Sequence, residues 1–298
     1  MEPREVIDGM EPFCSIVIPT RNRPQKVRAC VECLMGLDYP RDRYEVIVVD
    51  DGSVRPVEVE GAKLIRQPPA GPAKARNAGA QVARGELVAF TDDDCYPDVG
   101  WLRAAVDAWR RYPNDLLGGP VTNALANNPW AEASQTLVSY LYDYYSRGAA
   151  GPRFFTTNNV ALGRRRFLEL GGFDEALPRA AAEDREFCDR WLHAGYRLRF
   201  VPGMVVHHAH NLNASRFWQQ HFNYGRGAHY YHVTRARRWN EGLRVEPWSF
   251  YVGLLRYPWN CHRGARAMQL MALLVVAQVA NALGFFWERL TQWNLRYR

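Results

Sequence analysis

Residues 85–94 read Gly85-Glu86-Leu87-Val88-Ala89-Phe90-Thr91-Asp92-Asp93-Asp94, an apolar run that ends in three adjacent carboxylates. The apolar part has the length and composition of a buried β-strand, and Pro97 and Gly100 close the loop behind it. Three neighbouring carboxylates repel one another unless a cation or a set of donors neutralises them. Mg²⁺ or Mn²⁺ would do so, because these ions take one or two carboxylates together with phosphate oxygens. An acidic loop or helix cap before Trp101 is the alternative.

Two further strands that end in polar loops are predicted upstream. Residues 14–18 run into Pro19-Thr20-Arg21-Asn22, and residues 44–49 run into Asp50-Asp51-Gly52-Ser53. Residues 25–37 lie between them with apolar side chains at helical spacing. A strand, a helix and a strand in this order predict a βαβ unit of a parallel sheet, whose ligands bind at the carboxyl ends of the strands.

Several polar residues beside these strand ends suit a nucleotide. The Asp51 carboxylate can accept hydrogen bonds from a base N–H or from ribose hydroxyls, although Asp-Gly is also ordinary turn chemistry. A helix predicted over residues 73–83 carries Lys74, Arg76 and Asn77 near its start, where basic side chains and free N–H groups suit a diphosphate. An exposed basic helix face is the alternative.

A second group of candidate residues lies downstream. Glu183 and Asp184 precede a helical run, and acids at a helix N-terminus are stabilised there whether or not they are functional. A strand predicted over residues 197–206 leads into His207-His208-Ala209-His210, which holds three of the chain's eight histidines. A neutral imidazole, for which we favour His208, could complete an oxygen-rich metal site, and a structural cluster is the alternative.

These motifs together resemble those of the family 2 glycosyltransferases with the GT-A fold, over about residues 14–224. The resemblance rests on the order and spacing of the motifs. They are Pro19-Thr20-Arg21-Asn22, Asp50-Asp51-Gly52-Ser53, Ala75-Arg76-Asn77-Ala78-Gly79, Thr91-Asp92-Asp93-Asp94, Gly171-Gly172-Phe173-Asp174-Glu175 and Glu183-Asp184. It implies a Rossmann-like α/β fold with a mixed, mainly parallel sheet, and a C-terminal helical extension follows.

The resemblance also implies an inverting, metal-dependent transfer of a sugar from a nucleoside-diphosphate sugar, a UDP-sugar in the first place, to an acceptor hydroxyl. The residues implied to bind the donor are Pro19, Thr20, Arg21, Asn22, Asp51, Arg76, Asn77, Asp92 and Asp93. Asp94 is the favoured ligand of Mn²⁺ or Mg²⁺, with Asp93 in the other register and His208 as a further ligand. Asp184 would be the general base, and Glu183 would orient the acceptor or tune its neighbour.

The composition and the charge of the chain indicate which classes of binding partner and which cellular compartment suit it. The 298 residues carry a net charge of +7, with 38 Lys and Arg against 31 Asp and Glu, and the basic residues thicken toward the C-terminus. This favours phospholipid headgroups or phosphorylated substrates, whereas no nucleic-acid motif is found among these residues. The pair Cys30 and Cys33 has no second pair at zinc spacing, and residues 1–11 lack an apolar signal region. We therefore expect a cytoplasmic protein.

The C-terminal part departs from the sheet pattern, so we predict a catalytic domain over residues 1–212 and a helical region over 213–298. Residues 217–227 look helical and then turn. Residues 267–287 form about 21 uncharged residues, close to the length of a spanning helix. They could span a membrane, lie on its cytoplasmic face, or close a homo-oligomer. The segment Arg235-Ala236-Arg237-Arg238-Trp239 differs from the Gln-x-x-Arg-Trp motif of processive synthases, which favours a non-processive enzyme.

Two other functions fit parts of the pattern. A sugar-1-phosphate nucleotidyltransferase would favour a glycine-rich loop after the first strand, and Pro19-Thr20-Arg21-Asn22 is not one. A catalytically inactive scaffold subunit is disfavoured because Asp51, Asp92, Asp94 and Asp184 are all present. The sequence leaves the acceptor open: a glycan, a lipid-linked sugar or a protein.

Overall fold

The computed structural model describes residues 11–146, 151–176, 181–242 and 246–296. Its main sheet contains seven strands: β1 (Cys14–Thr20), β2 (Tyr44–Asp51), β3 (Lys63–Gln67), β4 (Leu87–Phe90), β6 (Leu116–Gly118), β8 (Val160–Gly163) and β9 (Leu198–Phe200). Their order is β3-β2-β1-β4-β8-β6-β9, and β8 alone among them runs antiparallel to its neighbours. This mixed, mainly parallel sheet confirms the predicted fold class.

Helices cover both faces of the sheet because alternate side chains of each strand point to opposite faces. Ile16 and Ile18 of β1 pack toward α1 (Pro24–Met35) and α3 (Trp101–Arg111), and Val17 packs toward the other face. That other face is covered by α2 (Pro72–Val82), α5 (Arg164–Glu169) and α6 (Glu183–His193). All three β1 side chains are fully buried, which contributes about 1.5–3 kcal/mol each to stability.

A small second sheet brings distant segments to one edge of the main sheet. It consists of β5 (Cys95–Pro97), β10 (Val206–His208) and β7 (Val121–Asn123), in the order β5-β10-β7. The single strand predicted over residues 197–206 was wrong, because Pro202 and Gly203 separate β9 from β10 and the two belong to different sheets. The register pairs His208 with Cys95, so His208 lies beside the end of the acidic run.

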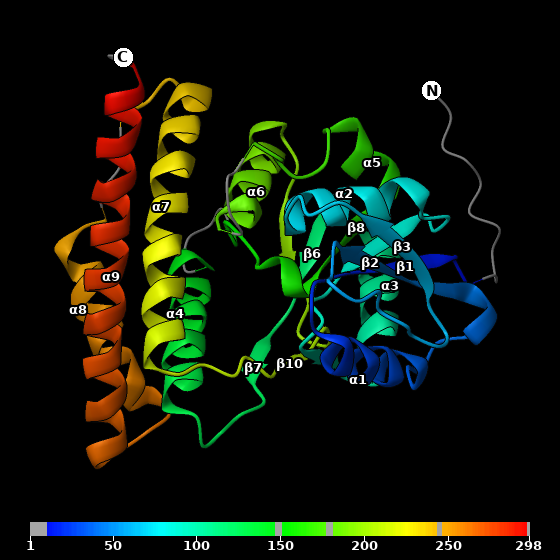
Figure 1. Ribbon diagram of the computed structural model, residues 1–298, viewed down its shortest axis with the longest axis horizontal. Coiled ribbons are helices and arrows are strands. Elements are labelled where there is room, and N and C mark those ends of the chain that lie inside the picture. Colours follow the sequence, from blue (N-terminus) through cyan, green and yellow to red (C-terminus); the bar gives the residue numbers. More distant parts are fainter. Residues whose placement is uncertain (1–10, 147–150, 177–180, 243–245, 297–298) are drawn as a thin grey trace.

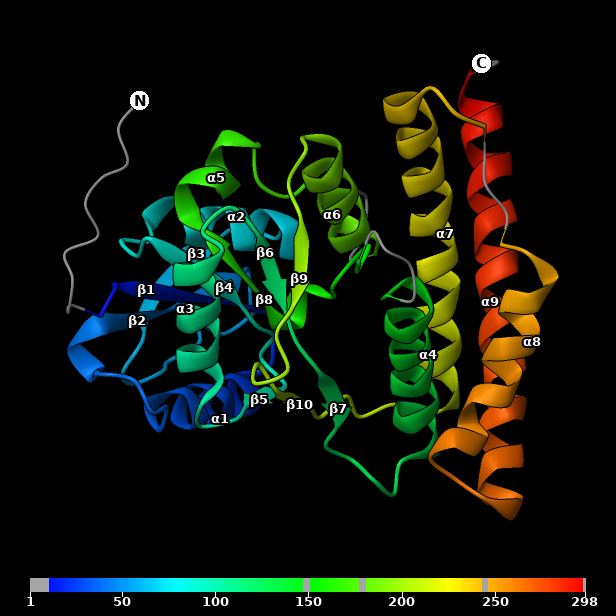
Figure 2. The ribbon, with the colours of Figure 1, turned by 180° about the vertical axis from the view of Figure 1, so that it is seen from behind.

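A layer of helices stands beside the sheet (Figures 1 and 2). It contains α4 (Pro129–Ser146), α7 (Ala214–Trp239), α8 (Trp248–Arg256) and α9 (Gly264–Arg296). The turn expected after residue 227 was wrong, since α7 continues to Trp239. Its glycine at 225 serves helix packing, because a Cβ there would lie 1.9 Å from the Asn281 carbonyl oxygen of α9. The domain boundary predicted at residue 212 stays a prediction. Helix α4 lies before that boundary in the sequence, yet it packs with α7, α8 and α9, which lie after it.

The long helix α9 has one buried and one exposed apolar face. Leu270, Leu274 and Ala277 are fully buried within the helical layer. The exposed face, which we call the α9 stripe, consists of Met268, Val275, Val276, Val279, Leu283, Phe286, Trp287 and Leu290. Among the described residues, α9 is the one helix long and apolar enough, by length and composition, to cross a membrane. Whether it meets a membrane or a second copy stays a prediction.

Candidate active site

The carboxyl ends of the central strands open into one cavity of about 2050 Å³. Most of the residues predicted for the site line its wall, as expected for strand ends that meet at one edge of a sheet. They are Pro19, Thr20, Arg21, Asp51, Arg76, Asp92, Asp93, Asp94, Glu183, Asp184 and His208. Residues from positions 19 to 208 are thus brought into one space.

Two predicted donor-binding residues do not line the cavity and instead hold loops. Asn22, which has a φ of 57°, accepts a hydrogen bond from the Val54 backbone N–H at 2.8 Å. Asn77 is buried on α2, where its side chain donates to the Phe173 carbonyl at 2.9 Å and accepts from the Phe173 N–H at 2.8 Å. Asn77 therefore anchors the Gly-Gly-Phe-Asp-Glu segment.

Each of the three adjacent aspartates has its own basic partner. Asp92 pairs with Arg76 at 2.6 Å, Asp93 with Arg23 at 3.0 Å, and Asp94 with Lys26 at 2.9 Å. These contacts neutralise the carboxylate cluster in the absence of a bound ligand. These roles of Arg23 and Lys26 were not predicted from the sequence, although both residues lie within four positions of Asn22, the end of the first polar loop.

The pKa values of Asp93 and Asp94 are shifted in opposite directions. Burial raises the pKa of Asp93, although Arg23 and Thr20 oppose that rise. Burial would also raise the pKa of Asp94, but hydrogen bonds from His208 and Lys26 hold it well below its ordinary value. Asp94 therefore stays ionised more firmly than Asp93, as a metal ligand must.

A possible set of metal ligands is formed by Asp94, Cys95 and His208, whose donor atoms lie within 4.8 Å of one another. Asp94 Oδ1 and His208 Nε2 are 3.2 Å apart. A carboxylate and an imidazole suit Mn²⁺ or Mg²⁺, whereas a buried thiol suits a softer metal, and burial raises the pKa of Cys95 well above its usual value. The donors that fit the predicted cation are thus Asp94 and His208.

Asp51 already holds the loop that follows β3. Its Oδ1 accepts from Gln67 Nε2 and from the Ala70 N–H, each at 2.8 Å, and its Oδ2 accepts from the Gly71 N–H at 2.9 Å. A carboxylate offers about four lone-pair sites, so Asp51 retains one for a further donor. Its position in the cavity wall allows that donor to belong to a ligand.

Arg76 connects the acidic run with the start of α6. Its guanidinium contacts Asp92 at 2.6 Å and Glu183 at 3.1 Å, and its side chain is almost completely buried. Burial raises the pKa of Glu183 to about 7, although Arg76 opposes that rise. Glu183 is therefore held in place by an ion pair and is not free to approach an acceptor.

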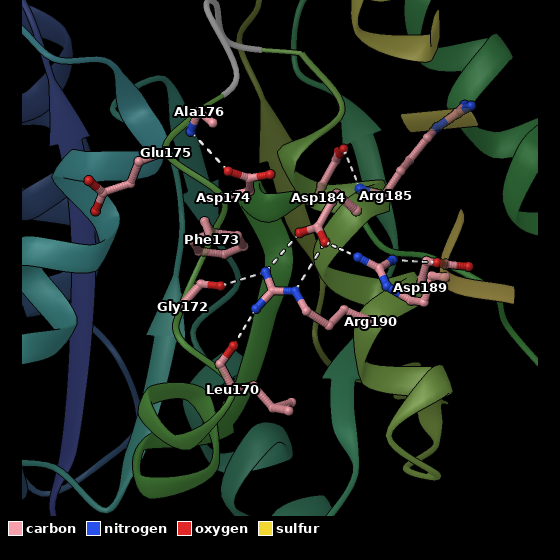
Figure 3. Close-up of polar contacts among 12 residues, drawn as sticks. Leu170, Gly172, Phe173, Asp174, Glu175, Ala176, Asp184, Arg185, Asp189 and Arg190 are labelled. Carbon is pink, nitrogen blue, oxygen red and sulfur yellow. Dashed lines mark hydrogen bonds and ion pairs between the residues drawn. The ribbon is translucent and has the colours of Figure 1, made fainter. Parts of the chain in front are cut away.

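Asp184, unlike Glu183, has a carboxylate that a ligand in the cavity can reach. It is half-buried, it lines the cavity, and its Oδ1 accepts a hydrogen bond from the Arg185 N–H at 2.7 Å (Figure 3). Burial raises its pKa as well, against the opposing charges of Arg185 and Arg76. A carboxylate with a raised pKa, facing a cavity, is suited to accept a proton.

The helix that carries Asp184 is fixed from both sides. Arg190 of α6 donates to the carbonyls of Leu170 and Gly172, the latter at 2.7 Å, which ties α6 to the Gly-Gly-Phe-Asp-Glu segment (Figure 3). From α7, Arg238 contacts Asp189 at 2.6 Å and also pairs with Glu186. Sequence reasoning missed this role of the Arg-rich segment, because these contacts join residues about 50 positions apart.

Comparisons with known proteins agree with this geometry. The family model "Glycosyl transferase family 2" matches residues 15–171. The glycosyltransferase AglE of Haloferax volcanii is 27% identical over 212 residues, which cover 66% of this chain and 67% of the relative. The pre-mycofactocin glycosyltransferase of Mycobacterium tuberculosis is 32% identical over 209 residues, which cover 66% of this chain but only 42% of the relative.

Solved structures share the fold at low sequence identity. The mannosyltransferase PcManGT from Pyrobaculum calidifontis, in complex with GDP-Man and Mn²⁺, superposes with a TM-score of 0.61 at 18% identity, covering 92% of this chain and 88% of that one. GalNAc-T7 with UDP, GalNAc and Mn²⁺ gives a TM-score of 0.55 at 17% identity, covering 94% of this chain and 56% of that one. The family model, in contrast, matches more than half of this chain's own sequence. This chain therefore belongs to glycosyl transferase family 2 and is a glycosyltransferase that uses a nucleotide-sugar donor.

Proposed function

We propose that this enzyme is a metal-dependent, inverting and non-processive glycosyltransferase, with Asp184 as its general base and a UDP-sugar as its favoured donor. The observation that carries the proposal is the shared cavity wall: the pair Asp94 and His208 and the available carboxylate of Asp184 line the same space. One end suits a cation with a diphosphate, and the other suits an acceptor hydroxyl.

In this proposal Asp94 and His208 hold Mn²⁺ or Mg²⁺, with Asp93 close by. When bound, the cation supplies positive charge that stabilises the departing nucleoside diphosphate. Support comes from the strongly ionised state of Asp94 and from the two solved structures that contain Mn²⁺ with a nucleotide or nucleotide sugar. Lys26, which pairs with Asp94 at 2.9 Å, is 35% exposed at its side chain and can swing aside.

The donor's nucleotide is assigned to the loops after β1, β2 and β3. Asp51 would accept from the base through its remaining lone pair, and Thr20 and Arg21 would lie beside the base and ribose. Arg76 is placed to act near the phosphates, because it joins Asp92 to Glu183 within the cavity wall. An arginine that holds two carboxylates also keeps the sugar-binding side rigid.

Asp184 takes the acceptor's proton as the acceptor oxygen attacks the anomeric carbon. The bond from that carbon to the nucleoside diphosphate breaks, the leaving group departs with the electron pair, and the new glycosidic bond forms on the opposite face. Glu183 is assigned a supporting role, because its ion pair with Arg76 occupies it. A pKa raised above that of an ordinary aspartate makes Asp184 a stronger base.

The same proposal places the enzyme on the cytoplasmic face of a membrane. Support comes from the α9 stripe, whose eight exposed apolar side chains run along one face of a single helix. A homo-oligomer closed through the stripe is the alternative use of this surface. The nucleotidyltransferase alternative is disfavoured by membership in family 2.

The test is the substitution Asp184→Asn, because the amide keeps the shape of the side chain but cannot accept the proton. We expect turnover to fall by roughly 10²–10⁴-fold, the range of general base catalysis. Turnover is read as nucleoside diphosphate released from a panel of nucleotide sugars with Mn²⁺, and UDP affinity is read by calorimetry. Asp107→Asn, an exposed residue of α3, is the matched control.

The two readouts separate the possible outcomes. Lost turnover with retained UDP affinity supports the proposal. Near-normal turnover removes Asp184 as the base, and a joint loss of UDP affinity and of the folded state makes the residue structural. An absence of release from every nucleotide sugar in the wild-type chain would favour the inactive scaffold.

A further inference from the structure

The cavity is larger than a nucleotide sugar requires. Its volume of about 2050 Å³ exceeds the roughly 300–1000 Å³ of ordinary small-molecule sites. It continues past Asp184 into the helical layer, where α4, α7, α8 and α9 all contribute to its wall. In the proposed function the acceptor hydroxyl lies at Asp184, so the part of the cavity beyond Asp184 can hold the rest of the acceptor.

One part of the far wall of this cavity, which we call the apolar wall, consists of apolar side chains. The side chains that form it include Leu137 and Leu141 of α4, Phe250 of α8, and Val279, Phe285 and Phe286 of α9. Polar side chains line it beside these residues, among them Gln278, Asn281 and Arg289 of α9, Arg235 of α7, and Glu246 just before α8. The apolar wall favours a hydrocarbon chain over a polar glycan.

The apolar wall leads directly to the surface of the molecule. Val279 and Phe286 belong both to the cavity wall and to the α9 stripe, and they are 47% and 55% exposed. On a helix, these two positions lie on the same face, seven residues apart. The cavity therefore has an apolar mouth, and the stripe extends from it along α9.

A cationic group stands between the apolar wall and the proposed base. Arg185 follows Asp184 at the start of α6 and lines the cavity, and its guanidinium lies 4.9 Å from the centre of the Phe154 ring. Figure 3 shows its side chain extending away from Arg190. Within the described chain Arg185 forms no ion pair, so its charge is available to an anionic ligand.

We propose that the acceptor is an amphiphile with a phosphate-bearing, hydroxylated headgroup and a long hydrocarbon chain. The headgroup lies at Asp184 and Arg185, and the chain runs along the apolar wall and leaves over Val279 and Phe286. This inference rests on the proposed function, because Asp184 defines where the acceptor hydroxyl must lie. The occupant of the apolar mouth is then the hydrocarbon chain of the acceptor.

The probe for this site is dodecyl phosphate below its micelle concentration, with butyl phosphate as the short-chain control. Both are titrated by calorimetry into the 298-residue chain saturated with UDP and Mn²⁺. Each buried methylene contributes about fourfold in affinity, so burial of about four additional methylenes makes dodecyl phosphate roughly 200-fold tighter. Equal affinity for the two probes overturns the inference.

Matched variants locate the chain and the headgroup. Val279→Asp, at the mouth, should weaken dodecyl phosphate at least tenfold, whereas Val275→Asp, on the stripe one turn earlier and 44% exposed, should change it less than twofold. Arg185→Gln should weaken both probes, and Arg165→Gln, whose side chain is 80% exposed, should weaken neither. Phe286→Ser replaces Val279→Asp if the latter does not fold.

Equal weakening by Val279→Asp and Val275→Asp would place the chain on the outer stripe and overturn the inference. An unchanged affinity in Arg185→Gln would overturn the assignment of the headgroup. Binding of UDP with Mn²⁺ is measured first in the same samples, which separates the two proposals. If UDP binds and dodecyl phosphate does not, the acceptor inference alone fails. If dodecyl phosphate binds and UDP does not, the donor site assigned in the proposed function is wrong.

Discussion

Glu183→Gln should remove a specific pH dependence of stability. Burial raises the pKa of Glu183 from its ordinary value of 4.5 to about 7, against the opposing charge of Arg76. Between these two values the folded state keeps a proton that the unfolded state has released, so the free energy of unfolding falls as pH rises. A rise of that size, at about 1.36 kcal/mol for each pKa unit, corresponds to roughly 3 kcal/mol.

The histidines oppose this effect in the same pH range. Burial lowers the pKa of His210 to about 4 and that of His221 to about 3, both from 6.5. Their neutral forms are favoured in the folded state, so their contribution is present above pH 6.5 and is lost as pH falls. The pH dependence of the free energy of unfolding of the wild-type chain therefore contains both effects. The difference in that free energy between wild type and Glu183→Gln isolates the contribution of Glu183.

The measurement is urea-induced unfolding followed by circular dichroism between pH 4.5 and pH 7.5. Relative to wild type, Glu183→Gln should gain about 3 kcal/mol in free energy of unfolding across this range, because the amide never ionises. Glu169→Gln replaces an exposed carboxylate of α5 whose pKa is lowered by a hydrogen bond from Arg165, so its difference should change only near the acid end of this range and stay flat above it. A flat difference for Glu183→Gln would refute the argument that burial outweighs Arg76 at this site.

Two further predictions concern the cation and the support of α6. Asp94→Ala should weaken UDP at least tenfold in the presence of Mn²⁺ and hardly at all without it, because the cation loses its firmly ionised ligand. Calorimetry with and without Mn²⁺ measures this, and equal losses would contradict the metal assignment. Arg238→Met removes one cationic partner of the buried carboxylates of Glu186 and Asp189, which keep Arg190 and Arg235, so it should destabilise by about 1.5–3 kcal/mol and lower turnover more than UDP affinity. Thermal unfolding beside an Arg165→Met control tests it, and a cost of less than about 1 kcal/mol, as for a surface pair, would contradict it.

Local sequence was sufficient for the central part of the fold. Short apolar runs that end in polar loops predicted β1, β2 and β4, because a buried strand needs apolar side chains on both faces. Parallel strands place their carboxyl ends at one edge, so the approach of Asp51 to the acidic run followed from the strand assignments alone. The neighbourhood of Asp94 and His208 was suggested by the family resemblance, and it arises in the fold through the register of β5 and β10.

Only the tertiary structure decided which distant residues meet. Periodicity shows that a segment has an apolar face, but it does not name the partner of that face. A turn was therefore expected after residues 217–227, where α7 continues and Gly225 serves the contact of α7 with α9. The pairing of Arg238 with Asp189 and the use of Asn77 as an anchor for Phe173 depend on contacts across about 50 to 100 residues. The extension of the cavity to Val279 likewise arises because α4, α7, α8 and α9 pack beside the sheet, an arrangement set by the fit of whole surfaces and not by any local pattern.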